Sequence, residues 1–308
     1  QPALRNTSFY VRWDQELGDS FSFNLSALRT ESEQTLQHQP GVYDLTLTPA
    51  HPDYAKAPVN TDFVYYPLYE LGGARNHSQS VTHHIAANLG GSAGEWHWNI
   101  GLSHSENGVR SHVGNVYLRS NYLEMARRLR IDGSDNADLM NSVRDSIDFS
   151  GAYSVDSLEA TSNRRIFDAP GGPVQLEWGV SFHSTRRRNT PDPRQIKGEL
   201  SSGAIGIKPY NLRSRDSAMF AEIDLPLHRA LQADVAIRLD RYQGFKTRIS
   251  PRFGIKWNPD ESIVMRASVG QGYRPPGLTD ERVPFDTMSY PRRMRIRPGL
   301  LPCIQDKD

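Results

Sequence analysis

Stretches in which every second side chain is apolar or aromatic run through the sequence and limit what it can fold into. The clearest lies between residues 246 and 270, where Phe253, Ile255 and Trp257 alternate with polar residues and a second stretch repeats the pattern. A period of two places such side chains on one face of a β-strand. Turn-forming residues at positions 258 to 261 separate the two stretches and predict a β-hairpin.

The same alternation recurs along the chain and predicts about ten strands in five hairpins. Within the hairpins the predicted turns are short, at about three to six residues. Between them the connections are long, over residues 29 to 78, 105 to 150 and 184 to 216, with one short exception at 241 to 245. Residues 121 to 131, in the second connection, predict a short amphipathic helix. Outer-membrane β-barrels separate short turns from long loops in this way, whereas soluble sandwiches have no reason to do so.

Composition leaves both a membrane protein and a soluble β-protein open. The mean hydropathy is −0.61, and no apolar run approaches the length that a transmembrane helix needs. A barrel strand needs only alternate apolar residues over about 10 positions. The net charge of +1 predicts no nucleic-acid partner, and the single cysteine, Cys303, cannot form an internal disulfide. The chain starts without Met or a signal peptide, so we expect its N-terminus to be cut.

The tryptophans favour the membrane interpretation. All five lie on the apolar faces of predicted strands, where an indole can sit at the level of lipid headgroups. Burial in the core of a soluble sandwich explains this placement equally well on its own, and the asymmetry of the connections favours lipid. The predicted lipid-interface aromatics are Trp13, Trp96, Trp98, Trp178 and Trp257.

A row of cations follows the polar face of the last predicted strands. Charges on the inner face of a barrel need water, counter-charges or a plug. Asp234 and Asp240 are available for ion pairs, and an anionic ligand is the alternative partner. The predicted residues facing a ligand or a plug in the lumen are Arg238, Arg248, Arg252, Lys256 and Arg266.

Motifs for catalysis and for metal or cofactor binding are missing from the sequence. It has no metal-ligand spacing, no phosphate-binding glycine loop and no G-x-S-x-G elbow. His83 and His84 would point to opposite faces of a strand, so they cannot share a metal. We therefore predict no enzyme, no metal and no cofactor. The triplet at residues 186 to 188, three arginines, predicts a solvated rim or a contact with an anion such as lipopolysaccharide.

Four stretches in the C-terminal half share a common pattern: FDAPGGPVQLEWGVSF at residues 167 to 182, and EIDLPL, LQADVAIRLDRY and SPRFGIKWNPDESIVMRASVGQGYRPP between residues 222 and 276. Together they resemble the barrel of TonB-dependent outer-membrane receptors. The aromatic-Arg-x-Pro ending falls on Tyr273, Arg274, Pro275 and Pro276. The resemblance implies an all-β fold: an antiparallel transmembrane β-barrel segment with about ten strands of a 22-stranded barrel. It also implies a place in the bacterial cell outer membrane, among lipid and lipopolysaccharide.

The resemblance further implies a receptor and transporter for a scarce nutrient such as a ferric siderophore, cobalamin, haem or a sugar. TonB would act through an N-terminal plug that the chain does not contain. No histidine follows Tyr273, which argues against haem. We expect residues 1–281 to form the barrel segment and residues 282–308, rich in Arg and Pro, to form an irregular and aberrant tail. A passive porin or adhesin barrel and a soluble β-sheet binding module are the alternatives.

Overall fold

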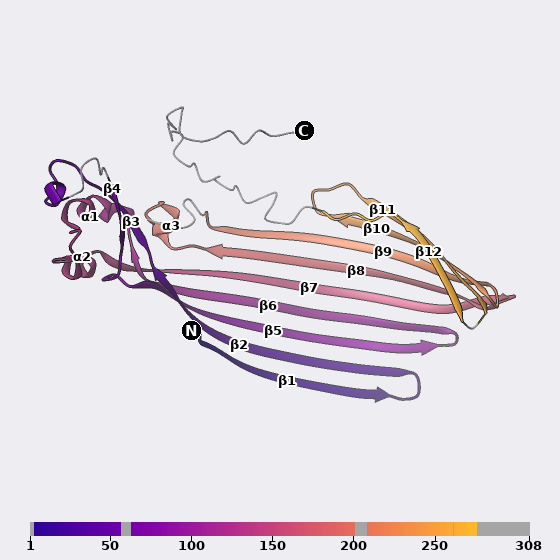
Figure 1. Cartoon of the computed structure of the whole chain (residues 1–308). Coiled ribbons are helices and arrows are strands. Elements are labelled where there is room, and N and C mark those ends of the chain that lie inside the picture. The colour runs from indigo at the N-terminus through magenta and orange to yellow at the C-terminus, as the bar shows by residue number, and fades with distance from the viewer. Residues whose placement is uncertain (1–2, 57–62, 201–207, 261, 276–308) are drawn as a thin grey trace, which may run out of the picture.

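One ten-stranded antiparallel sheet dominates the computed structural model, which describes residues 3–56, 63–200, 208–260 and 262–275 (Figure 1). Its strands are adjacent in chain order, apart from a small separate hairpin. This confirms the all-β class and the five predicted hairpins. The strands are β1 (Ala3–Leu17), β2 (Phe21–Pro40), β5 (Gly73–Ala93), β6 (Trp96–Tyr117), β7 (Arg144–Ala169), β8 (Gly172–Thr190), β9 (Tyr210–His228), β10 (Leu231–Tyr242), β11 (Arg248–Asp260) and β12 (Ile263–Gly270).

The tight turns lie together at one end of the sheet (right in Figure 1). Gly18 and Gly94 make two of them at φ +69° and +63°, a left-handed conformation that glycine adopts without steric strain. The turn after β11 comes later than its sequence predicts, since Asp260 still pairs with Ile263. The strand continues because the Asn258 amide donates to Ala230 O at 2.8 Å, which keeps it bonded to the β10 side.

At the other end, the long connections between hairpins are shorter than predicted because the strands continue. β2 runs to Pro40 and β5 begins at Gly73, while β6 runs to Tyr117 and β7 begins at Arg144. In these extensions most residues on both faces are polar and the apolar ones are scattered, so apolar alternation does not reveal them, although the backbone ladder is unbroken for most of their length. The sheet therefore extends well beyond its apolar part on this side.

Two connections fold together into a cap at this end. The first supplies the hairpin of β3 (Val42–Thr46) and β4 (Phe63–Pro67) and the 3-10 turn η1 (Tyr54–Lys56). The second supplies η2 (Arg119–Asn121), α1 (Tyr122–Arg128) and α2 (Asn136–Val143), and α1 confirms the predicted helix. Their shared core consists of Tyr43, Leu45, Leu47, Tyr66, Leu68, Leu71, Met125, Leu129, Leu139, Met140 and Val143. None of the helices in the described ranges is long and apolar enough to span a bilayer.

The third connection is fixed by Asp192, the charged N-capping residue of helix α3 (Pro193–Ile196). The Asp192 carboxylate accepts from the Arg194 amide at 2.9 Å and from Arg194 Nε at 3.0 Å. Hydrogen bonding to the Arg194 side chain is the main reason why the pKa of Asp192 falls to about 2. The Asp148 amide also donates to Asp192, at 3.1 Å, so the connection is tied back to β7.

A buried asparagine joins the two parts of the cap. Asn136 is fully buried, and its Nδ2 donates to Tyr66 Oη and to Arg130 O, each at 2.8 Å. Its Oδ1 accepts from the Arg130 amide at 2.8 Å. Every polar atom of this side chain is therefore bonded, which removes the cost of burying it.

We expect Asn136→Ala to destabilise the cap by about 2 kcal/mol, because the backbone groups of Arg130 lose their partners inside the core. Hydrogen exchange followed by mass spectrometry should show faster exchange in α2 and β4 than in the central strands. Asn141→Ala is the matched control, since Asn141 lies exposed on the same helix. Equal exchange in the two variants would contradict this role for Asn136.

Candidate functional site

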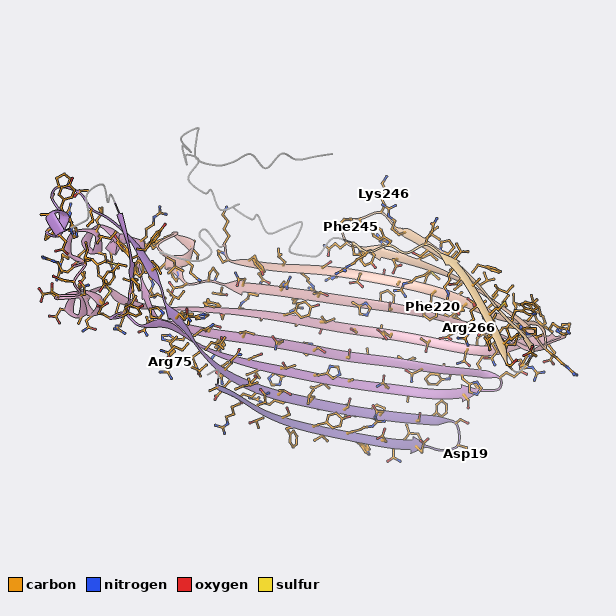
Figure 2. All side chains as sticks on the ribbon, viewed as in Figure 1. Asp19, Arg75, Phe220, Phe245, Lys246 and Arg266 are labelled. Atoms are coloured by element: carbon orange, nitrogen blue, oxygen red, sulfur yellow. The ribbon has the colours of Figure 1, made fainter. Side chains whose placement is uncertain are left out.

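The register of the ladder gives the sheet two chemically different faces. Directly opposite residues on neighbouring strands point to the same side, and successive residues along a strand point to opposite sides. Side chains stand on both faces in Figure 2, in which Asp19 marks the turn end and Arg75 the opposite end. One row of partners crosses six strands through Trp13, Leu25, Ala87, Leu102, Leu158 and Phe182.

This row belongs to an apolar belt that covers one face beside the tight turns. On β1 the belt runs from Phe9 to Leu17, nine residues that span about 26 Å of extended strand. Its side chains are exposed, with Phe9 at 67% and Phe182 at 51%. An apolar surface this wide is unusual on a soluble monomer, and its height matches the apolar band of about 25 Å on outer-membrane barrels.

All five tryptophans lie on the belt face, and Trp96, Trp98 and Trp257 lie close to the tight turns. Trp13, Trp178 and Trp257 are 42–53% exposed. Trp98 lies over its cross-strand partner Gly91, where a Cβ would come within 2.5 Å of the indole ring. The remaining indole, Trp96, carries the Arg164 guanidinium 5.3 Å above its ring centroid.

The five predicted cations lie on the opposite, polar face of β10, β11 and β12. Arg238 Nε pairs with Asp240 Oδ1 at 2.9 Å, and Arg252 Nη2 lies 3.2 Å from Asp234 Oδ2. Both carboxylates that the sequence offers as counter-charges are therefore used. The other three cations are Arg248, Lys256 and Arg266.

Two of these cations share a hollow of about 460 Å³ with the aromatic end of the family motif. Arg238 and Arg252 line it together with Tyr242 and Tyr273. The two tyrosine rings lie 6.1 Å apart, and Arg248 stacks 4.8 Å from the Tyr273 centroid. Of the motif, Pro276 lies outside the described residues.

The remaining two cations are separated from this hollow. Lys256 and Arg266 are directly opposite each other on β11 and β12, nearer the tight turns. Like charges in this position repel. Within the described ranges neither has an ion pair, so this end of the polar face is suited to an anionic partner.

The polar face also carries an acidic patch that the sequence did not reveal. Glu177 lies directly opposite Glu222, and Asp224 lies directly opposite Asp234. In the described part of the chain, Glu177, Glu222 and Asp224 have no ion pair, and Asp234 Oδ2 is buried without a hydrogen bond. The four carboxylates alternate with apolar residues on three strands, but only the register brings them together. Repulsion between them would be relieved by a cationic group above the patch. In the same ranges no cluster of three His, Cys, Asp or Glu side chains is placed to hold a metal ion.

Asp234 keeps its place because its cross-strand partner is glycine. The carboxylate lies over Gly254, where an added Cβ would clash with it. We expect Gly254→Ala to displace the carboxylate from Arg252 and to lower the free energy of unfolding by about 1–3 kcal/mol. Urea unfolding of the protein in detergent measures this change.

Gly272→Ala serves as the control, since a Cβ there has no described neighbour within 4 Å. A Gly254→Ala variant as stable as this control would show that the position of Asp234 does not depend on Gly254.

Comparisons with known proteins agree with the two-faced sheet. Residues 12–293 match the family model described as TonB dependent receptor-like, beta-barrel. The ferric enterobactin receptor PfeA from Pseudomonas aeruginosa has a similar structure, with a TM-score of 0.57 and 12% identity over 90% of this chain and 34% of that chain. For the siderophore receptor PirA from Acinetobacter baumannii the TM-score is 0.54, with 14% identity over 90% of this chain and 34% of that chain.

The RagAB peptide transporter has a TM-score of 0.56 with 9% identity, over 87% of this chain and 32% of that chain. The chain therefore spans about a third of the length of these structures. At such low identity the likeness shows the fold alone. No curated protein sequence matches the chain.

Proposed function

The chain belongs to the TonB-dependent receptor family, and from this premise we propose that its sheet is part of the wall of an outer-membrane transporter. The belt faces lipid, the polar face lines the lumen, the tight turns face the periplasm and the cap faces the exterior. A single observation carries this proposal: the register keeps one apolar and one more polar face across all ten strands. Such a wall needs lipid on one side and water or protein on the other.

The nutrient that we propose is a ferric siderophore. Two of the structures with the same wall are named as siderophore receptors, and both share about nine tenths of this chain's length. A peptide is the competing class, because a peptide transporter shares the wall as well. Transport of either kind requires binding and movement, so no residue of the wall has to perform covalent chemistry.

We assign the charged residues of the polar face to holding a plug that fills the lumen. Among the described residues, Glu177, Glu222 and Asp224 of the acidic patch have no ion pair, and Lys256 and Arg266 have none either. A segment with arginines or lysines above the patch would remove the repulsion between Glu177 and Glu222. TonB would act through that segment, and the wall would hold it until the energy-dependent step.

Cysteine labelling in intact cells tests the orientation of the wall. In a Cys303→Ser background, we expect a membrane-impermeant maleimide to label Asn141→Cys in the cap from outside. Asp19→Cys in a tight turn should react only after the outer membrane is permeabilised. Ile237→Cys in the belt should stay unlabelled in both conditions because lipid covers it. Ala236→Cys is the matched control, because it is the neighbouring position on the same strand but lies on the polar face, which lipid does not cover.

Reaction of Ile237→Cys in an aqueous extract would contradict the membrane location and favour a soluble β-sheet module. A labelled cap and a protected belt support a wall in the membrane, whichever ligand is transported.

Uptake of radiolabelled ferric enterobactin tests the transport proposal in cells that express the gene encoding the chain. We expect uptake to need TonB. Glu177→Gln combined with Glu222→Gln should reduce it about tenfold, since a lost charge-assisted hydrogen bond costs about 1.5–3 kcal/mol. The control is Glu16→Gln with Glu95→Gln, which changes the charge equally near the tight turns. Uptake without TonB would instead indicate a passive porin.

A further inference from the structure

Two histidines lie directly opposite each other near the end of the sheet that carries the cap. His77 on β5 pairs with His112 on β6, two positions along β5 from Arg75, which marks this end in Figure 2. Both side chains are exposed. Directly opposite residues carry Cβ atoms about 4.5–5.5 Å apart on one face, so the two imidazoles stand side by side. Local spacing cannot reveal this pair, because only the register of β5 and β6 brings it together.

One ring nitrogen of each histidine is bonded to the strand on its outer side. His112 Nδ1 donates to Asp148 Oδ1 on β7 at 2.9 Å, since a carboxylate can only accept. His77 Nδ1 lies 3.0 Å from the hydroxyl of Thr35 on β2, to which it can donate. With the proton on Nδ1, the lone pair is on Nε2, and this is the tautomer in which a histidine binds a metal ion through Nε2.

The second ring nitrogen, Nε2, is free in both histidines. Among the described residues neither Nε2 atom makes a hydrogen bond or an ion pair. His112 Nε2 lies over Gly114, 3.8 Å from the point that a Cβ would occupy. In an imidazole, Nε2 lies on the side of the ring away from Nδ1. Because the two Nδ1 atoms are bonded to β2 and β7, on opposite sides of the pair, both Nε2 atoms are directed towards the space above β5 and β6.

Other histidines of the protein use both ring nitrogens. His183 Nδ1 lies 2.9 Å from Asp216 Oδ2, and its Nε2 lies 3.2 Å from Glu159 Oε1. His51 in the cap also forms hydrogen bonds through both nitrogens. Their hydrogen-bonding capacity is filled by protein groups, so these side chains have a structural explanation. The opposed pair on β5 and β6 is held in the same way through Nδ1, but it keeps two lone pairs for another partner.

An open hollow of about 420 Å³ gives the pair access to solvent. His77 and His112 line it together with Asp148, and residues of β7, β8 and the third connection complete its lining. An ion bound by the two imidazoles therefore has room for its remaining water ligands.

The nearest cations do not block the space in front of the pair. Arg110 lines the hollow, but it precedes His112 on β6, whereas His112 Nε2 is directed towards Gly114, on the other side along the strand. Arg75 lies opposite Gly114 and is exposed, so water and salt screen its charge. The carboxylate of Asp148 contributes the compensating negative charge.

We propose that His77 and His112 bind one divalent transition-metal ion, of the copper, nickel and zinc class, through their Nε2 atoms. Imidazole suits these ions, whereas calcium and magnesium prefer oxygen ligands. Metal–nitrogen bonds of about 2.0–2.1 Å place the two Nε2 atoms about 3 Å apart, which opposite residues of a ladder can reach. Asp148 is a positioning residue, because its bond to Nδ1 orients the His112 ring. The inference goes beyond the proposed function and requires only the register of β5 and β6.

Electron paramagnetic resonance with Cu²⁺ tests the ligands directly. The protein is studied in mild detergent with a streptavidin-binding tag in place of polyhistidine, and with Cys303→Ser to remove its one thiol. With one equivalent of Cu²⁺ we expect splitting from two coordinated nitrogens. His84→Ala is the matched control and should leave the spectrum unchanged, because His84 Nδ1 lies 2.6 Å from Ser105 Oγ but no histidine lies opposite it. A spectrum without nitrogen splitting would overturn the proposal.

Titration calorimetry with Zn²⁺ measures the contribution of each imidazole. We expect His77→Ala and His112→Ala each to weaken binding at least about tenfold, because one imidazole alone cannot chelate the ion. The double variant should bind hardly more weakly than either single variant, which shows that the two side chains act as a unit. Asp148→Asn should weaken binding about tenfold through the orientation of His112. Unchanged affinity in the single variants, or losses that simply add, would overturn the shared site.

Competition with Ca²⁺ tests the class of ligand. An excess of about a hundredfold should leave the copper spectrum unchanged, because a hard cation binds imidazole poorly. Displacement of Cu²⁺ by Ca²⁺ would show that carboxylates such as Asp148 are the ligands, and the histidine site would then be wrong.

Discussion

The antiparallel register is the constraint on which the rest of the structure depends. A shift of one residue between two strands would move every side chain of one strand to the opposite face. Trp13 would then lie directly opposite Asn24, and Phe182 directly opposite Ser157. The observed register instead joins Trp13 to Leu25 and Leu158 to Phe182, so the belt is continuous. Burial of a core does not hold this sheet together, since most belt residues are exposed. The backbone hydrogen-bond ladder does so.

The same register brings together the charges that transport would use. Glu177 and Glu222 are 45 positions apart, yet they are direct partners across β8 and β9. Such pairs weaken a sheet that stands alone, whereas they can bind a cationic segment tightly when the lumen is filled. In the proposed function, the wall gives up some stability of its own for the ability to hold and release a plug.

Alternation of apolar residues predicts the belt well because it is a local signal. The ten strands, their hairpins and the common face of the five tryptophans all follow from a period of two. The strand extensions do not, because Gln34 and Ser78 lie in a two-sided polar ladder that carries no apolar period. The pairing of residues across strands is also invisible to a local pattern. The sequence identifies the cations, but only the register shows that they divide between the Tyr273 hollow and the Lys256–Arg266 pair. The cap core joins Leu45 to Met125 across two connections, which no local pattern can show.

The edges of the sheet decide what the wall can do in a membrane. Among the described residues β1 and β12 each have a partner strand on one side only, and both are exposed along their whole length. Their outward N–H and C=O groups can bond to water in solution, but in hydrocarbon each unpaired group costs several kcal/mol. A lipid-facing belt therefore requires both edges to be paired, either with each other or with further strands. The curvature of the sheet favours closure of this kind, since β11 and β12 turn out of the plane of the central strands (Figure 1). Belt and edge pairing are thus one requirement, because lipid can cover the face only when the ladder has no open side.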